Sequence, residues 1–143
     1  MTGLTAATTY YYRVTAINAG GESTATSQAS ATTTAASSTA CHVVYSVTTQ
    51  WNVGFGTAIS IQNTGTTPIN NWNLTWTWAG NQAITQAWNA TYTQTGANAK
   101  LTYMSYNSSI AIGATLSGLG LNGSYSGTNN APTAFYVNGT LCH

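Results

Sequence analysis

Charged residues are almost absent from this sequence. Of its 143 residues only Arg13, Glu22 and Lys100 are charged, which is 2% of the chain, where an ordinary globular domain has about 25%. Acid-base hydrolysis of glycosides requires two carboxylates, a Ser-His-Asp triad requires its acid, and a Mg²⁺ or Ca²⁺ site requires several anionic oxygens. A single carboxylate meets none of these needs, so we expect a protein that is not an enzyme and uses no cofactor.

Two further classes are excluded by what is scarce. Binding to nucleic acid takes a patch of lysine and arginine, and the chain has two such residues in all. No run of 18 or more apolar residues occurs, so no membrane span is predicted. The polar residues are nearly all Thr, Ser, Asn, Gln and Gly. Their hydroxyl and amide groups form hydrogen bonds without charge, which favours a neutral, hydroxyl-rich ligand.

Cysteine is also scarce, and its placement is informative. Cys41 and Cys142 bracket the last hundred or so residues, and each is followed by a histidine, His42 and His143. One interpretation is a disulfide that joins the two ends of a domain in an oxidising, extracellular setting. The alternative is a zinc site. Adjacent Cys-His pairs lack the usual ligand spacing and point to opposite sides of an extended strand, so the disulfide is favoured.

The first forty residues differ from the rest. Residues 10–17 are rich in tyrosine and β-branched residues and predict a strand, residues 18–23 contain two glycines and predict a turn, and a weaker strand follows to Thr33. Residues 34–40 are Ser, Thr and Ala without periodicity and are interpreted as a linker.

Residues 41–143 show short alternating runs separated by glycine and asparagine, and no helical period. This pattern predicts an all-β antiparallel sandwich. The clearest stripe is Trp72, Leu74 and Trp76, predicted to be core, with Trp78 at either the core or the rim. The predicted strand runs are residues 43–48, 58–62, 72–78, 84–93, 100–105, 115–121 and 134–137.

A set of ordered motifs carries a family resemblance. The motifs are CHVVYSVTTQWNVGF (41–55), ISIQNTG (59–65), INNWNLTW (69–76), ITQAWNA (84–90), YNSSI (106–110), LNGS (121–124), APTAF (131–135) and NGT (138–140). Through them, residues 41–143 resemble a family 2 carbohydrate-binding module of the type that binds crystalline cellulose. The resemblance implies an immunoglobulin-like or jelly-roll-like sandwich of about nine strands, a disulfide that links its ends, and no catalytic activity.

The resemblance also implies a flat binding face with three exposed aromatic residues. By motif these fall on Trp51, Trp88 and Tyr106, with polar neighbours at Gln86 and Asn122. Gln86 and Trp88 are two residues apart, so in a strand both point to one face.

The sequence departs from the family at three positions. Tyr106 stands where the family usually has Trp, and Thr49 and Ala58 stand where Asn is common. We expect weaker stacking at Tyr106, partly offset by its hydroxyl.

Residues 1–33 resemble the last two strands of a fibronectin type III domain, through GLTAATTYYYRVTAIN (3–18). The earlier strands of such a domain are absent, and a lone hairpin is marginally stable in water. We expect this fragment to be mobile or to pair with another chain through its open edges.

The function favoured by the sequence is therefore secreted, non-catalytic binding of cellulose, which targets an attached enzyme to polysaccharide. Chitin is the alternative ligand. A structural or adhesive protein that self-assembles through the N-terminal hairpin is a second hypothesis, since near-zero net charge permits association. A copper-dependent oxidative enzyme would need His as the first residue of the mature chain; here Met1 begins the chain and both histidines adjoin the cysteines.

Overall fold

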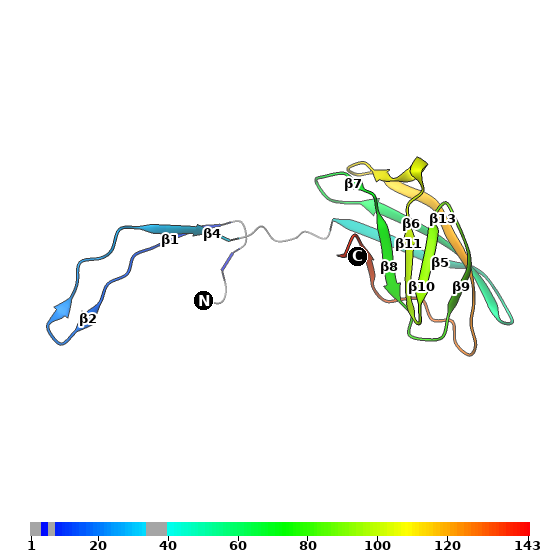
Figure 1. Ribbon diagram of the computed structural model, residues 1–143, viewed down its shortest axis with the longest axis horizontal. Coiled ribbons are helices and arrows are strands. Elements are labelled where there is room, and N and C mark those ends of the chain that lie inside the picture. Colours follow the sequence, from blue (N-terminus) through cyan, green and yellow to red (C-terminus); the bar gives the residue numbers. More distant parts are fainter. Residues whose placement is uncertain (1–3, 6–7, 34–39) are drawn as a thin grey trace. The chain divides into compact units, whose positions relative to one another are not determined.

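The computed structural model describes residues 4–5, 8–33 and 40–143, which divide into two compact units, residues 1–37 and 38–143 (Figure 1). No helix in this described part is long and apolar enough to cross a membrane. The predicted linker, residues 34–40, lies outside the described residues except for Ala40. The Ala40 carbonyl accepts a hydrogen bond from the Thr64 N–H at 3.1 Å, which joins it to the second unit.

The N-terminal unit is a long antiparallel hairpin. Its strands are β1 (Thr9–Tyr12), β2 (Ile17–Asn18), β3 (Gly21–Glu22) and β4 (Ala29–Thr32). β1 pairs with β4 and β2 pairs with β3. The predicted single strand over residues 10–17 is interrupted, because in its middle backbone N–H groups bond to side-chain hydroxyls and not to backbone carbonyls of the opposite strand. The Val14 N–H donates to the Thr26 hydroxyl at 3.1 Å, and the Ala16 N–H donates to Ser23 Oγ at 3.0 Å.

This hairpin leaves apolar side chains in water. Ile17 is 77% exposed, and Tyr11 and Val14 are each 65% exposed. Two strands alone have no second layer against which to bury such groups. The fibronectin-like origin of the segment and its predicted self-association stay predictions of the sequence.

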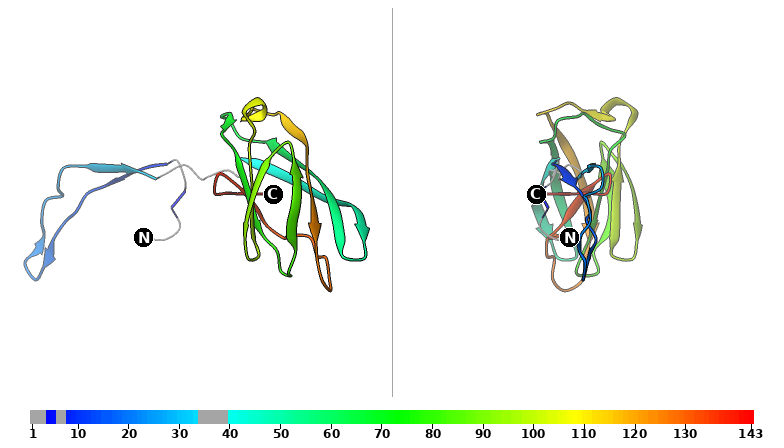
Figure 2. Two further views of the ribbon diagram at one scale, coloured as in Figure 1. Left: turned by 45° about the vertical axis from the view of Figure 1, so that its right-hand side comes forward. Right: turned by 90° about the vertical axis from the view of Figure 1, so that its left-hand side faces the viewer.

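The second unit is a β-sandwich. The described strands are β5 (Cys41–Trp51), β6 (Gly54–Asn63), β7 (Ile69–Asn70), β8 (Asn73–Thr77), β9 (Ala83–Trp88), β10 (Thr91–Thr95), β11 (Asn98–Thr102), β12 (Ser109–Ile110), β13 (Thr115–Ser124), β14 (Phe135–Val137) and β15 (Thr140–Cys142), with a 3₁₀ turn η1 (Ser105–Asn107) before β12. One sheet has the order β5-β6-β13-β9 and the other β10-β11-β8-β14-β15, with β7 and β12 as a small separate pair. The nine strands of the two main sheets match the predicted fold (Figures 1 and 2).

The core lies between the two sheets, and strand parity decides which side chains enter it. On β6, Phe55, Ile59 and Ile61 are buried, while Ala58 on the opposite face is exposed. The predicted core stripe is confirmed, because Trp72, Leu74 and Trp76 are all buried. Trp78 also belongs to the core, where its ring meets that of Phe55 edge to face at a centroid distance of 6.3 Å.

Two predicted runs end earlier than their periodicity indicates. The run 84–93 divides at Asn89, whose φ of 58° bends the chain out of one sheet, so that β9 and β10 belong to different sheets. The run 100–105 ends as a strand at Thr102, and the chain then forms η1. β10 is largely exposed and η1 has no buried residue, so the sequence pattern does not mark where either strand ends.

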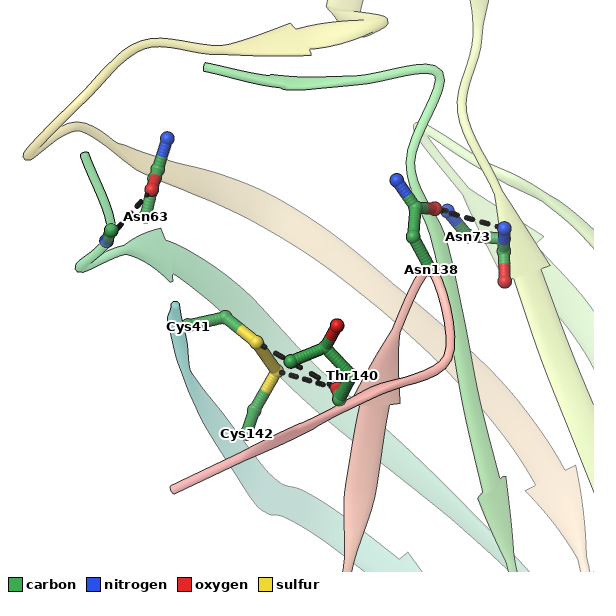
Figure 3. The surroundings of a disulfide bond; sticks show 7 residues. Cys41, Asn63, Asn73, Asn138, Thr140 and Cys142 are labelled. Carbon is green, nitrogen blue, oxygen red and sulfur yellow. Dashed lines mark hydrogen bonds between the residues drawn. A yellow bond between two sulfur atoms is a disulfide. The ribbon is translucent and has the colours of Figure 1, made fainter. Parts of the chain in front are cut away.

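Cys41 and Cys142 form a disulfide that joins the first and last strands of the sandwich (Figure 3). The same ends are also joined by the backbone: His143 N–H donates to the Cys41 carbonyl, and Val43 N–H donates to the His143 carbonyl, both at 3.1 Å. With both sulfurs oxidised, neither cysteine is a thiolate that could bind zinc. Within the described residues no group of three or more His, Cys, Asp or Glu gathers at one place.

Tyr45 on β5 packs into the aromatic core, 5.5 Å from Phe135 between ring centroids. Its hydroxyl is buried and has no hydrogen-bond partner, and neither has Trp78 Nε1. Burial raises the pKa of Tyr45 to about 12, and the neighbouring Trp78 indole opposes this rise without reaching hydrogen-bond geometry. The folded state therefore holds Tyr45 in its neutral form.

We expect the free energy of unfolding to fall with pH between 10 and about 12, because the unfolded chain releases the Tyr45 proton there while the folded chain keeps it. Tyr45→Phe removes this dependence. Near neutral pH the variant should match the parent to within about 1 kcal/mol, since no hydrogen bond is lost. Urea unfolding followed by tryptophan fluorescence at several pH values measures both effects. Tyr136→Phe, on an exposed tyrosine, is the control; an unchanged slope in Tyr45→Phe would contradict the assignment.

Candidate functional site

Two indole rings lie against the outer face of the four-stranded sheet, each over a glycine. Trp51, the last residue of β5, is paired with Gly54 of β6, and a Cβ built on Gly54 would overlap the ring atoms of Trp51. Trp88, the last residue of β9, is paired with Gly120 of β13, where a Cβ would overlap ring atoms of Trp88. The missing side chains let each ring rest on the backbone of the neighbouring strand. One ring face packs on the sheet, and Trp51 and Trp88 remain 50% and 38% exposed.

A polar row crosses the same face between the two indoles. In register, Thr49 pairs with Gly56, Gly56 with Asn122, and Asn122 with Gln86. The Asn122 side-chain N–H donates to Gln86 Oε1 at 3.4 Å. Gly56 lets these side chains approach the backbone, because a Cβ there would lie 2.7 Å from the Thr49 hydroxyl and 3.1 Å from Asn122 Oδ1. The sheet thus brings Gln86 and Asn122 together beside Trp88; the spacing in the sequence predicts this for Gln86 and Trp88, and the family resemblance implies it for Asn122.

Tyr106 reaches this face from outside the sheet. It is the central residue of η1 and is 68% exposed. The turn is anchored through its neighbour Asn107, whose carbonyl accepts the Trp72 indole N–H at 2.8 Å and whose Oδ1 accepts the Met104 N–H at 2.7 Å. The Tyr106 hydroxyl donates to Oδ1 of Asn89, the residue after Trp88, at 3.0 Å. Tyr106 therefore lies next to the Trp88 end of the face.

The three aromatic residues follow one line along β13. Gly54, which lies beneath the Trp51 ring, is paired with Ser124 of β13. Gly120, which lies beneath the Trp88 ring, belongs to β13 itself. The side chain of Asn89, which bonds Tyr106, donates to the Gly118 carbonyl of the same strand at 2.7 Å. From Ser124 to Gly120 is about 13 Å at about 3.3 Å per residue. In Figure 1 and in the left-hand view of Figure 2, η1 and the β5–β6 turn lie at opposite ends of the sandwich. The line follows β13 from Ser124 to Gly118, so an extended ligand would meet all three rings in turn.

The face carries no formal charge. Residues 41–143 contain no Asp or Glu, and their one lysine is Lys100. Lys100 lies on β11 of the opposite sheet, where it lines a shallow groove of about 330 Å³ together with Thr75 and Tyr136. The aromatic face can therefore offer stacking surface, amides and hydroxyls, and nothing that attracts an ion.

The sequence does not predict some features of this face. The glycine floors Gly54 and Gly120 are found only once the strand register is known. Asn89 lies inside the run 84–93, which the sequence predicts as one strand, whereas the structure ends β9 at Trp88. The signal for this break was the asparagine itself, because asparagine is enriched in the left-handed conformation. Two of the three departures from the family pattern, Thr49 and Ala58, lie exposed on this face.

Comparison with known proteins agrees with this architecture. The sequence profile of the cellulose binding domain family matches residues 41–142. Endoglucanase B of Cellulomonas fimi is 44% identical over 144 aligned residues, which cover 99% of this chain and 14% of that protein. Exoglucanase B of the same species is 41% identical, over 99% of this chain and 13% of that protein. The chain thus spans about one seventh of the length of these curated relatives.

Among solved structures, the chitin-binding domain of Chi18aC from Streptomyces coelicolor is similar with a TM-score of 0.60 and 32% identity. The match covers 73% of this chain and 96% of that domain. The family profile covers well over half of the chain, and the sheet order and disulfide form the sandwich that the motifs implied. The chain belongs to the cellulose binding domain family, that is, to the family 2 carbohydrate-binding modules.

Proposed function

We propose that residues 41–142 bind crystalline cellulose without catalysis, through Trp51, Trp88 and Tyr106, with Gln86 and Asn122 as hydrogen-bonding neighbours. The observation that carries the proposal is the pair of indoles seated on glycines of one sheet, in line with the third aromatic ring and separated by neutral polar side chains. Such a face is complementary to a flat polymer surface whose sugar rings are apolar on their faces and carry hydroxyls at their edges.

The energy of binding comes mainly from dehydration of stacked surfaces. Burial of apolar area contributes about 25 cal/mol per Å², and stacking of one nucleobase on an aromatic side chain contributes about 1–3 kcal/mol. We take the same scale for a sugar ring. Because the two indoles are already packed on Gly54 and Gly120, their rings lose little freedom when a ligand covers the other face.

The module would act by holding an attached enzyme at its insoluble substrate. This part of the proposal is supported by the glucanase relatives, of which the chain matches a minor share. The disulfide and these relatives also support a secreted, extracellular protein, because disulfides persist in oxidising compartments. That the exposed hairpin self-assembles stays a hypothesis of the sequence.

Chitin is the second candidate ligand, and one observation favours it: the similar solved domain from Streptomyces coelicolor is a chitin-binding domain. The two polymers share an extended β-linked backbone with apolar ring faces, so one aromatic line serves both. Parallel binding isotherms on microcrystalline cellulose, chitin and xylan decide between them. Tighter binding to chitin than to cellulose would replace the first proposal by the second, and no binding to either would refute both.

We expect binding to cellulose to be nearly independent of ionic strength. The face holds no formal charge and Lys100 lies on the other sheet, so there is no Coulomb attraction for salt to screen. The dissociation constant at low salt and at about 0.5 M NaCl should agree within about twofold. An oligonucleotide-binding protein of known salt dependence serves as the assay control. A steep loss of cellulose binding with salt would show that charge, and not stacking, holds the polymer.

A further inference from the structure

We infer that Asn89 is a positioning residue that holds Tyr106 in line with Trp88. The inference rests on the proposed function of this face and assigns a role to a residue outside the aromatic set. Asn89 directly follows Trp88, has a φ of 58°, and stands where the chain leaves one sheet for the other. Its side chain is thereby turned out of the strand, toward β13 and η1.

Asn89 forms hydrogen bonds with two segments, β13 and η1. The Asn89 side-chain N–H donates to the Gly118 carbonyl of β13 at 2.7 Å. Its Oδ1 accepts the Tyr106 hydroxyl at 3.0 Å, and its backbone carbonyl accepts the Asn107 side-chain N–H at 2.7 Å. Both polar atoms of the side chain are used, so the amide orientation is decided by its partners: the N–H faces a carbonyl and the oxygen faces a hydroxyl.

Tyr106 depends on this contact more than its neighbours do. The backbone of η1 is anchored through Asn107, whereas the Tyr106 ring is 68% exposed and its hydroxyl bond to Asn89 is the hydrogen bond that fixes its far end. An exposed tyrosine without that bond would sample several rotamers and lose this freedom on binding. This hydrogen bond between Tyr106 and Asn89, the tether, therefore orders the ring before the ligand binds.

The tether also gives a physical reason for tyrosine at this position, where the family usually has tryptophan. The phenol hydroxyl extends from the end of the ring and reaches Asn89 Oδ1. The smaller ring offers less stacking area than an indole. The hydroxyl partly offsets this loss of affinity, because its bond to Asn89 orders the ring before binding. Because its proton is directed to the protein, the hydroxyl presents lone pairs, not a donor, to a ligand.

The test compares two ways of cutting the tether. Asn89→Gly keeps the left-handed backbone accessible and removes the side chain, and Tyr106→Phe removes the hydroxyl alone. Each should weaken binding to microcrystalline cellulose about three- to tenfold, the scale expected for one side chain that must be ordered on binding. The double variant should be no weaker than the weaker single variant, because both changes cut the same bond.

Asn71→Gly is the matched control. Asn71 also has a positive φ, 50°, and its hydrogen bond is made by the backbone N–H, to the Ser108 carbonyl, so the same substitution removes no side-chain bond. It should bind as the parent does. A second readout is NMR of ¹³C-labelled tyrosine, in which the Tyr106 ring should become more mobile in both tether variants and stay ordered in Asn71→Gly.

Three results would overturn the inference: additive losses in the double variant, parent-like affinity of a folded Asn89→Gly, or an equally ordered Tyr106 ring after either change. If Asn89→Gly does not fold, Tyr106→Phe decides alone, through ring mobility and affinity together. Failure of the proposed function is separate, because it shows as an absence of cellulose binding by the parent chain itself.

Discussion

Trp88→Ala should lower the affinity for crystalline cellulose by about 1–3 kcal/mol, that is, about 5- to 150-fold. Of the three aromatic residues, Trp88 lies at the middle of the line, beside the Gln86–Asn122 pair and next to the residue that holds Tyr106. Its removal therefore interrupts the platform where a bound chain would be continuous. Depletion isotherms on microcrystalline cellulose, with equal protein loading, measure the change in dissociation constant.

Tyr136→Ala is the matched control for this prediction. Tyr136 is 40% exposed, close to the 38% of Trp88, but it stands on β14 of the opposite sheet. Its loss should leave binding unchanged. If Trp88→Ala binds as tightly as the parent, the face assignment is wrong. If Tyr136→Ala loses binding instead, the groove beside Lys100 on the opposite sheet is the site.

The second large effect concerns stability. Replacement of both Cys41 and Cys142 by serine should lower the free energy of unfolding by about 4–5 kcal/mol, since the disulfide closes a loop of 101 residues and restricts the unfolded chain accordingly. That is a large share of the roughly 5–15 kcal/mol by which a domain is stable. Urea titration of the parent and the double variant, followed by tryptophan fluorescence, gives the difference directly.

Two observations complete that experiment. The parent treated with reductant should lose a similar amount, which separates the loss of the cross-link from any effect of serine at two buried positions. Below its melting temperature the variant should still bind cellulose, because the backbone bonds between Cys41, Val43 and His143 keep the ends of the sandwich joined. A stability loss under about 1 kcal/mol would contradict the expectation that the disulfide stabilises the domain by restricting the unfolded chain.

Much of the fold could be predicted because burial leaves a period in the sequence. Trp72, Leu74 and Trp76 alternate with polar residues, so they are recognised as the core face of a strand before any partner is known.

The N-terminal hairpin is predicted less well from its sequence. Its strand pairing is interrupted where the hydroxyls of Ser23 and Thr26 accept hydrogen bonds from backbone N–H groups of the other strand. The spacing of apolar residues does not predict such side-chain to backbone bonds.

The break at Asn89 shows the same limit inside the sandwich. Apolar residues recur on both sides of Asn89, at Trp88 and at Ala90 and Tyr92, although the chain leaves one sheet and enters the other there. Periodicity reports that a residue is half buried and not which sheet it belongs to. The left-handed φ of Asn89, which decides this, is favoured by its residue type but is imposed by its partners on Gly118 and Tyr106.

The sequence by itself favoured an uncharged ligand for residues 41–143, since no fold can supply carboxylates that these residues do not contain. It also determined the sandwich and, by resemblance to a family, which aromatic residues to expect on its face. Only the tertiary structure decided how those residues are held: which glycines lie beneath Trp51 and Trp88, and which asparagine restrains Tyr106. These contacts join strands that are distant in the sequence, and strand register, not local composition, brings them together.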